Sequence, residues 1–548
     1  MPQEQKSISF FIKVNIIKCF SVFVAFFFFI FLNNAFSQEK LIIDKDYEIR
    51  IDKFINKKNC NIHTSSKPYN YSSIKNFIDK DTIYKVRKFK PWFYRKLLNE
   101  SLFIIDTTNL HVEINPELDI NYGSNLNSGE NPFKNVRGLS VKGNITDKLF
   151  FNTSYFEVQD NYLDYVANRI KVSHVVPGNM LTKPFKENSR VNDYGIAYGS
   201  VSYSPSKHFN FQFGHDKNFI GDGYRSLLLS DNAVMYPHLK ITANYGKLQY
   251  VNMLISFQNR QRPYTEVGGY QKKSASIHYL SYLFGKSLEV GLFEGVIYQV
   301  ADSTKKDFNF NYINPVIFSK SIMYGLRDRN NVLIGLNLKY KITNLLQVYS
   351  QIVIDDIDTK NIINSNSINN KTGYQIGMKW FDVFGINNLY LQNEYNKVRP
   401  YTYAHIFEDQ SYTHFGQSLT HPQNANFHEL VTRVNYFYKR FEVMLKTNIV
   451  QVGKDTILNE THWGNNLFLS DLYAENNIEE NNHKFLQGLK SDIFICDLKL
   501  SYTVNPKSNL RIYLGYFIRN EKNIINKLSE GMVYFGIQTN FRNQYLDF

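Results

Sequence analysis

The chain has 548 residues and a formal net charge of +14, and 16% of its residues are aromatic, including 39 Tyr and 44 Phe. No segment reaches 18 consecutive apolar residues, which excludes a membrane-spanning helix. A soluble exported enzyme does not need so many aromatic residues, whereas a transmembrane β-barrel places aromatic girdles at both membrane interfaces.

Residues 1–37 have the pattern of a secretory signal peptide. Three lysines precede the apolar run CFSVFVAFFFFIFL, and the small-residue site Ala35-Phe36-Ser37 follows it. We therefore expect an exported mature chain that begins near Gln38, and we exclude nucleic acid as a partner. Its remaining positive charge is expected to be spread over loops, and it would also suit lipopolysaccharide phosphates as neighbours.

Residues 38–109 lack the alternating pattern of the later chain. The stretch from Lys90 to Ile105 has helical spacing, whereas HTSSKPY, from His63 to Tyr69, is typical of a loop. We expect a small helical segment in the periplasm, with insertion into the barrel as an alternative. No disulfide is expected between Cys60 and Cys496, because the second cysteine falls on the expected lipid-facing side of a strand.

From residue 110 onward the chain alternates apolar and polar residues, in segments of about ten, as membrane-spanning strands do. The polar face of several segments carries charged residues, which predicts a wet or hydrogen-bonded interior. The pattern predicts an all-β fold over 110–548, an antiparallel transmembrane β-barrel of 18 strands. The predicted strands lie near 110–122, 136–146, 148–158, 192–204, 207–216, 237–246, 247–257, 272–284, 286–300, 330–342, 345–356, 372–382, 386–396, 427–438, 440–452, 497–504, 510–519 and 531–541.

The connections between these segments alternate between short and long. Thr146-Asp147 and Lys439-Arg440 are short, whereas 159–191, 397–426 and 453–490 are long. Outer-membrane barrels have short periplasmic turns and longer extracellular loops. The alternation therefore predicts a barrel in the cell outer membrane, surrounded by its lipids, with both termini periplasmic. The final residue, Phe548, fits the terminal aromatic residue that the insertion machinery recognises.

The connection after the fifth predicted strand contains FIGDGYRSLLLSDN, Phe219 to Asn232. It has neither the spacing of a phosphate loop nor that of a nucleophile elbow. Three consecutive leucines should not face water. We therefore predict that the glycines let this loop fold inward and plug the barrel mouth. The candidate plug and ligand-binding residues are Gly221, Asp222, Gly223, Tyr224, Arg225, Ser226, Asp231 and Asn232.

The stretch from Asn218 to Thr242 resembles the signature of the Wzi-like capsule-assembly proteins, through its Gly-x-Gly-aromatic turn and the run Ser-Leu-Leu-Leu-Ser-Asp-Asn-Ala. Four further stretches resemble RemB-like gliding-motility outer-membrane proteins: HTSSKPY, GLFEGVIY (Gly291 to Tyr298), Glu394 to His405, and His414 to Glu429. The resemblance implies an 18-stranded barrel with a helical periplasmic N-terminal part and loops that occlude the pore. It also implies a role in gliding motility or surface polysaccharide handling, with surface polysaccharide or motility adhesin proteins as partners.

Arg399, Tyr401, Tyr403 and His405 lie close together in the connection 397–426, and they are candidates to stack on or hydrogen-bond a sugar. Further histidines follow at 414, 421 and 428, but neither a cysteine nor the usual zinc-ligand spacing accompanies them, so we expect no metal and no cofactor.

No Ser-His-acid set can be placed, so we predict no catalytic residues and no enzymatic activity. Two classes of function remain. The first is a non-enzymatic surface anchor that binds polysaccharide or a motility partner, and the inward loop favours it. The second is a transport channel, either porin-like or for hydrophobic substrates.

Overall fold

The structure is a computed structural model of the chain. The expected signal peptide, residues 1–37, lies outside the residues that it describes. Within the described ranges, no helix combines the length and apolar character needed to cross a membrane. The described residues are 40–41, 43–78, 91–127, 130–146, 148–184, 189–263, 270–299, 314–319, 322, 330–356, 366–455, 462–471, 482–539 and 542–548.

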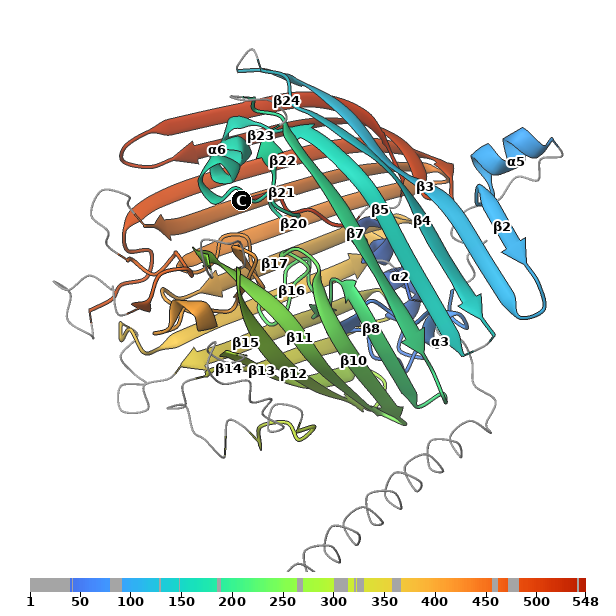
Figure 1. The fold of residues 1–548 in the computed structure, drawn as a ribbon, viewed down its shortest axis with the longest axis horizontal. Coiled ribbons are helices and arrows are strands. Elements are labelled where there is room, and N and C mark those ends of the chain that lie inside the picture. The colour runs from blue at the N-terminus through green and yellow to red at the C-terminus, as the bar shows by residue number, and fades with distance from the viewer. Residues whose placement is uncertain are drawn as a thin grey trace, which may run out of the picture.

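The strands form one closed antiparallel barrel of 18 strands, which confirms the predicted fold class (Figure 1). Neighbours in the chain pair with each other, and β24 (Lys527–Gln538) closes the ring on β3 (Leu110–Asn125), with Ile537 opposite Ile120. The other strands of the ring are β4 (Phe133–Ile145), β5 (Leu149–Asn161), β7 (Asn192–Tyr203), β8 (Phe209–Asp216), β10 (Tyr236–Tyr245), β11 (Leu248–Pro263), β12 (Tyr270–Phe284), β13 (Leu288–Gln299), β14 (Asn331–Lys341), β15 (Leu346–Asp356), β16 (Lys371–Phe381), β17 (Leu389–Val398), β20 (Phe427–Tyr438), β21 (Phe441–Lys454), β22 (Leu489–Asn505) and β23 (Leu510–Lys522).

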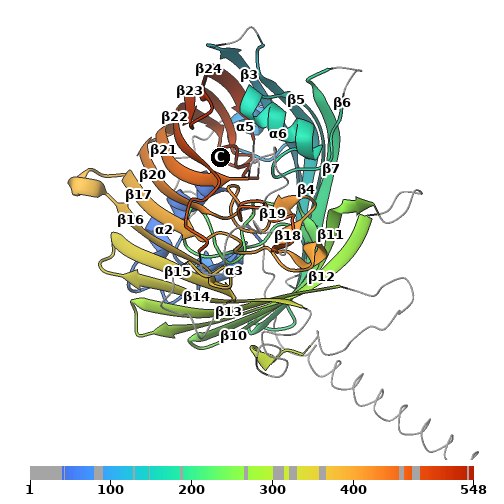
Figure 2. The same cartoon turned by 90° about the vertical axis from the view of Figure 1, so that its left-hand side faces the viewer.

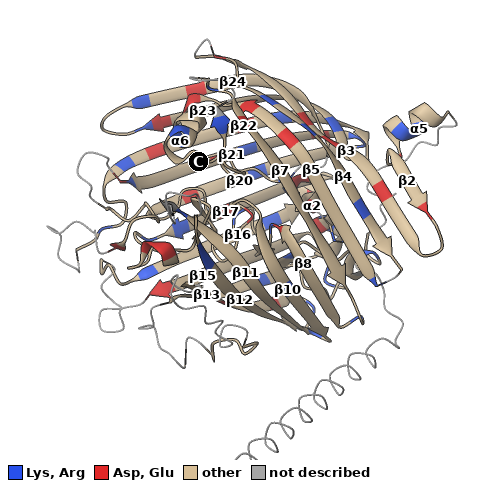
Figure 3. Ribbon diagram, in the orientation of Figure 1, with Lys and Arg blue, Asp and Glu red and all other residues tan. Residues whose placement is uncertain are grey.

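The strands keep apolar side chains outside and polar side chains inside. On β23, Ile512 and Leu514 are about half exposed on the outer surface, whereas Arg511 and Tyr513 are buried inside. Figure 3 shows that charged positions occur along most strands and are not confined to the loops. The lumen is therefore a polar interior, as the alternating sequence pattern predicts.

The two ends of the barrel carry different connections, which confirms the predicted alternation. One end has short turns, such as 204–208 and 439–440, and is called the short-turn end below. The other end, called the long-loop end, has connections such as 162–191 and 399–426, although 523–526 there is also a short turn. The connections contain α6 (Asp164–Ser173), β6 (Lys183–Pro184), β9 (Phe219–Ile220), η3 (Val383–Gly385), η4 (Glu408–Gln410), β18 (Thr413–His414) and β19 (Gln417–Ser418).

Residues 43–78 lie inside the barrel, in its short-turn half, and are called the N-terminal plug below. Figure 2 shows its helices, α2 (Lys45–Ile55) and α3 (Tyr71–Ile74), within the ring of strands. Asp44 begins α2, because its carboxylate accepts the backbone N–H groups of Asp46 and Tyr47. A short strand, β1 (Ser66–Lys67), follows and pairs with β9.

For this part of the chain the structure has the alternative, insertion into the barrel, in place of the expected helical segment in the periplasm. Charged side chains of the N-terminal plug pair with inward-facing residues of the barrel wall, and burial of these charges is favourable only when they are paired. The pairs include Arg50–Glu442 at 3.0 Å, Asp44–Arg511 at 3.2 Å, Asp52–Lys379 at 2.5 Å and Lys53–Asp382 at 2.8 Å.

The stretch from Lys90 to Ile105 is not one helix. It forms α5 (Trp92–Leu98) and then β2 (Phe103–Asp106), which pairs with β3 so that Phe103 lies opposite Ile114. The aromatic and β-branched run Phe103-Ile104-Ile105 favours a strand, and β3 extends beyond the end of β24, which leaves it an edge to pair with. The sheet therefore begins at residue 103, not 110.

The C-terminal residues 542–548, called the C-terminal tail below, turn back into the lumen after β24. Tyr545 and Phe548 are buried, and Phe548 lies beside α6 at the long-loop end (Figure 1). The expectation that the C-terminus lies at the short-turn end is therefore wrong. The tail carries Arg542 and Asp547, whose charged partners, Asp216 and Arg225, lie inside the barrel.

Candidate functional site

The loop 217–235, called the glycine loop below, folds into the long-loop half of the lumen. Its three leucines, at 227, 228 and 229, are completely buried, as predicted. Tyr403 and Tyr412 each donate a hydrogen bond of 2.8 Å, to the carbonyls of Leu227 and Leu228. The glycine loop is thus held between the barrel wall and the connection 399–426.

The glycines of this loop are needed for close approach. Gly221 has a φ of +146°, which side-chain-bearing residues rarely adopt, and its N–H donates to the Ser65 carbonyl at 2.7 Å. A Cβ on Gly223 would lie 2.3 Å from a carboxylate oxygen of Glu394. Gly223 itself has no positive φ, so only space requires glycine there.

The glycine loop joins the N-terminal plug through Asp222. Its carboxylate accepts hydrogen bonds from Thr64 at 2.7 Å and from Ser65 at 2.6 Å. Lys45 of α2 donates to the Gly223 carbonyl at 3.2 Å. The two inserted segments therefore form one continuous filling of the lumen.

Arg225 is the centre of a buried ionic cluster. It is completely buried and pairs with Glu429 at 2.9 Å and with Asp547 of the C-terminal tail at 3.1 Å. Glu394 accepts the backbone N–H groups of Tyr224 and Arg225, at 2.7 and 3.0 Å. This cluster ties the loop to β17, β20 and the tail.

The remaining predicted loop residues also turn inward. The Ser226 hydroxyl donates to the Ile220 carbonyl and lies 3.3 Å from the side-chain oxygen of Gln351 on β15. Asp231 accepts from Tyr545 at 2.8 Å, and Asn232 donates to the Ser418 carbonyl at 2.9 Å. All eight predicted residues of the glycine loop therefore contact other parts of the chain, and their geometry is that of a plug.

The structure does not assemble the predicted sugar platform in the connection 399–426. Tyr401 and Tyr403 are completely buried, so their ring faces are covered by protein. Arg399 donates to the carbonyls of Asn370 and Ser367. His405 is half-buried, and burial lowers its pKa to about 4. These four side chains pack within the protein and stabilise the connection 399–426, which explains why they occur close together in the sequence.

The later histidines do not gather at one site either, because each of them contacts a different partner. His421 contacts Glu429 at 2.7 Å, whereas His428 contacts Gln451 at 2.8 Å, and burial lowers the pKa of His414 to about 3. Within the described residues, no group of three or more His, Cys, Asp or Glu side chains is arranged to hold a metal ion.

A cleft of about 850 Å³ opens at the long-loop end, between α6, the glycine loop and the connections 399–426 and 455–488. Arg169 of α6 lies over the Phe548 ring at 4.2 Å, and its guanidinium donates to the Pro422 carbonyl. Arg260 lies over the Tyr270 ring at 5.0 Å. Among the described residues, neither arginine has a carboxylate within ion-pair distance, and burial lowers the pKa of Arg169 to about 10, which leaves it charged at neutral pH.

The two cleft arginines were not predicted from the sequence. Arg169 lies on α6 and Arg260 lies near the end of β11, and no local motif marks either of them. The cleft also presents amide side chains, including those of Asn424 and Gln423, and the ring of Phe468. Its two other cations, Lys454 and Arg519, both pair with Glu521.

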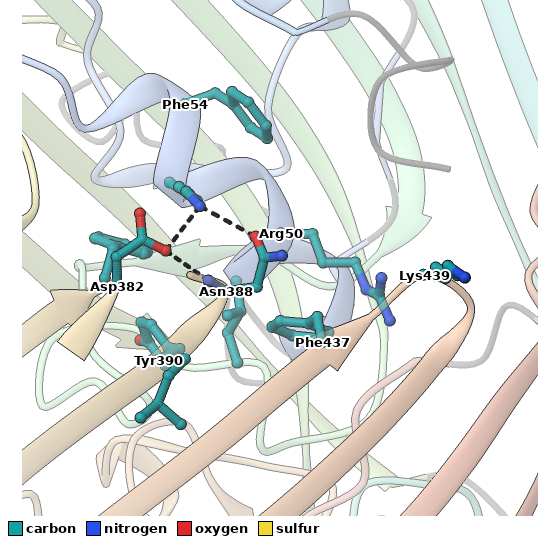
Figure 4. A pocket seen from close by; sticks show the side chains of 11 residues that line it. Arg50, Phe54, Asp382, Asn388, Tyr390, Phe437 and Lys439 are labelled. Atoms are coloured by element: carbon teal, nitrogen blue, oxygen red, sulfur yellow. Dashed lines mark hydrogen bonds and ion pairs between the residues drawn. The ribbon is translucent and has the colours of Figure 1, made fainter. Parts of the chain in front are cut away.

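A smaller cavity of about 280 Å³ lies between α2 and the barrel wall at the short-turn end (Figure 4). Lys53 bridges Asp382 and Asn388 at 2.8 and 3.1 Å, and Arg50 lies over the Phe437 ring at 4.2 Å. The contacts drawn in Figure 4 hold the N-terminal plug against the turn between β16 and β17, and the Arg50–Phe437 contact holds it against the end of β20.

The closed ring of 18 strands, with a polar interior and an apolar outer surface, defines an outer-membrane β-barrel fold. The chain is similar in structure to Wzi, an outer-membrane protein involved in group 1 capsule assembly in Escherichia coli and described as a carbohydrate-binding β-barrel. The TM-score is 0.53 at 14% identity, over 92% of this chain and 100% of Wzi. OprD from Pseudomonas aeruginosa is a weaker match, with a TM-score of 0.40 at 11% identity over 80% of this chain and 97% of OprD. No protein-family model and no curated protein matches the sequence.

Proposed function

We propose that the protein is a non-enzymatic, closed outer-membrane barrel that binds surface polysaccharide, and that it contributes in this way to polysaccharide attachment or assembly, or to gliding motility. One observation carries the proposal: the lumen is filled from both ends, while an open cleft at the long-loop end presents two arginines that have no carboxylate partner in the described part of the chain. The similarity to Wzi supports carbohydrate as the ligand class, and the resemblance to gliding-motility proteins supports the motility role.

The chemistry of the cleft suits an acidic polysaccharide. Arg169 and Arg260 offer planar donors that match a carboxylate. Asn424 and Gln423 offer amide groups for sugar hydroxyls, and Phe468 offers an aromatic surface. A filled lumen does not suit a transport channel, which needs a continuous path.

Binding measurements test the cleft directly. The double variant Arg169→Gln/Arg260→Gln is expected to bind alginate, an acidic polysaccharide, roughly tenfold or more weakly than the parent, because each charge-assisted hydrogen bond contributes about 1.5–3 kcal/mol. Biolayer interferometry on detergent-solubilised protein measures this, with neutral dextran as the control ligand.

The matched control is Lys484→Gln, which removes an exposed charge at the long-loop end that does not line the cleft. Equal affinity of the parent and the double variant for alginate would contradict the assignment of the cleft. Steady open channels formed by the parent in a planar bilayer would instead favour the transport alternative.

The proposed orientation places the long-loop end outside the cell, beside lipopolysaccharide, and the short turns in the periplasm. In a protein without native cysteines, Ile524→Cys is expected to react with an impermeant maleimide on intact cells, and Lys286→Cys is not. Ile524 is 93% exposed at the long-loop end, and Lys286 is exposed at the short-turn end. Equal labelling of the two positions on intact cells would rule out this orientation.

A further inference from the structure

The helix α5 and the strand β2 expose apolar side chains outside the barrel. Trp92, Phe93 and Tyr94 are 58%, 61% and 52% exposed, and α5 has no buried residue. Every residue of β2 is exposed as well, including Phe103. Such a cluster is larger than the scattered apolar residues of an ordinary surface, so it calls for a partner.

This apolar projection is held firmly against the barrel rim. Asn505 donates to the carbonyls of Lys96 and Glu100, both at 2.9 Å, and Arg440 donates to the Asn99 side chain at 3.2 Å. Figure 1 shows α5 and β2 together beyond the short-turn ends of the neighbouring strands. Their position relative to the wall is therefore set by hydrogen bonds from two short turns.

The same two turns carry part of an aromatic girdle. Tyr438, Phe441 and Tyr502 flank the turns that hold α5, and each is exposed on the outer surface. Aromatic girdles mark the level of the lipid headgroups around an outer-membrane barrel. Further exposed aromatic residues at the short-turn end are Phe209, Tyr245, Phe284, Tyr340 and Phe384.

We propose that α5 and β2 form an interfacial anchor that lies in the phospholipid headgroup region beside the short-turn rim. Two observations select a lipid surface: the continuity of α5 with the girdle, and its composition. Trp and Tyr prefer the membrane interface, and α5 itself carries two basic residues, Arg95 and Lys96, and no acidic residue, which suits contact with lipid phosphates.

Depth-dependent fluorescence quenching tests this proposal. A protein whose only tryptophan is Trp92, made by Trp380→Phe and Trp463→Phe, is reconstituted into phosphatidylcholine vesicles with bromine on the upper acyl chain. We expect roughly a twofold loss of Trp92 emission relative to unbrominated vesicles, together with protection from aqueous iodide. The matched control retains only Trp463, which lies in a long connection at the opposite end and is expected to be unaffected by bromine.

Full quenching of Trp92 by iodide, with no quenching by brominated lipid, would overturn the proposal and point to a protein partner for this surface. The triple variant Trp92→Ala/Phe93→Ala/Tyr94→Ala provides a second measurement. It should fold, because these residues are exposed, and it should insert into vesicles more slowly than the parent. An unchanged insertion rate would also count against the anchor.

Discussion

A protein that lacks both residues 43–78 and residues 219–232 is expected to form steady open channels in a planar bilayer, whereas the parent is expected to be silent. Barrels of 16–18 strands leave an aqueous channel when their lumen is empty. The inward-facing charged residues of the strands can be hydrated once the inserted segments are absent. The connection 399–426 would lose its supports, because Tyr403 and Tyr412 donate to carbonyls of the deleted loop.

Each single deletion is expected to raise conductance only slightly. Removal of the glycine loop leaves the N-terminal plug in the short-turn half, and removal of the plug leaves the loop in the other half. Heat-modifiable mobility on gels verifies that each variant is folded. A double-deletion protein that is folded in the membrane and still silent would show that other segments close the pore.

Replacement of Arg225 by alanine is expected to destabilise the folded barrel by about 3–5 kcal/mol, the usual effect of removing one partner of a buried ion pair. The side chains of Glu429 and Asp547 are at most 2% exposed, so both would remain buried after the loss of Arg225. Of its ionisable partners, Glu429 would keep His421, whereas Asp547 would keep its ion pair with Lys446 at 3.0 Å. Urea unfolding of the protein in vesicles, followed by tryptophan emission, measures the change in the free energy of unfolding.

Two further variants identify the cause of that loss. Arg225→Ala combined with Glu429→Gln removes the carboxylate that has lost its arginine and is expected to recover much of the stability, because Asp547 keeps its ion pair with Lys446. Arg225→Lys keeps the charge but loses the two-pronged contact with Glu429, so an intermediate stability is expected. If Arg225→Ala unfolds at the same urea concentration as the parent, the cluster does not hold the loop.

The conspicuous motifs of the sequence meet at one place in the lumen. HTSSKPY supplies Thr64 and Ser65 to Asp222, and the later stretches supply Glu394 and Glu429 to the backbone and side chain of the glycine loop. Phe293 of GLFEGVIY belongs to the same apolar cluster as the three leucines. These motifs therefore describe mainly how the pore is filled. Asn232, Gln423 and Asn424 also line the cleft, whereas its two arginines, Arg169 and Arg260, lie outside the motifs.

The sequence by itself determined the barrel, its strand number and the inward course of the glycine loop. These features follow from local patterns: alternation with a period of two separates a lipid-facing side from an interior, and three leucines need burial. The spacing between the predicted strands also showed that short and long connections alternate.

Only the tertiary structure decided that the N-terminal plug and the C-terminal tail fill the lumen together with the glycine loop, and where the cleft lies. Arg50 pairs with Glu442, and Asp547 pairs with Arg225, across hundreds of residues. A lone Asp or Arg in a sequence has the same local pattern whether it lies in water or in a buried pair. Since burial of such charges is favourable only with a specific partner, the N-terminal plug, the C-terminal tail and the cleft at Arg169 depended on which distant residues the closed barrel brings together.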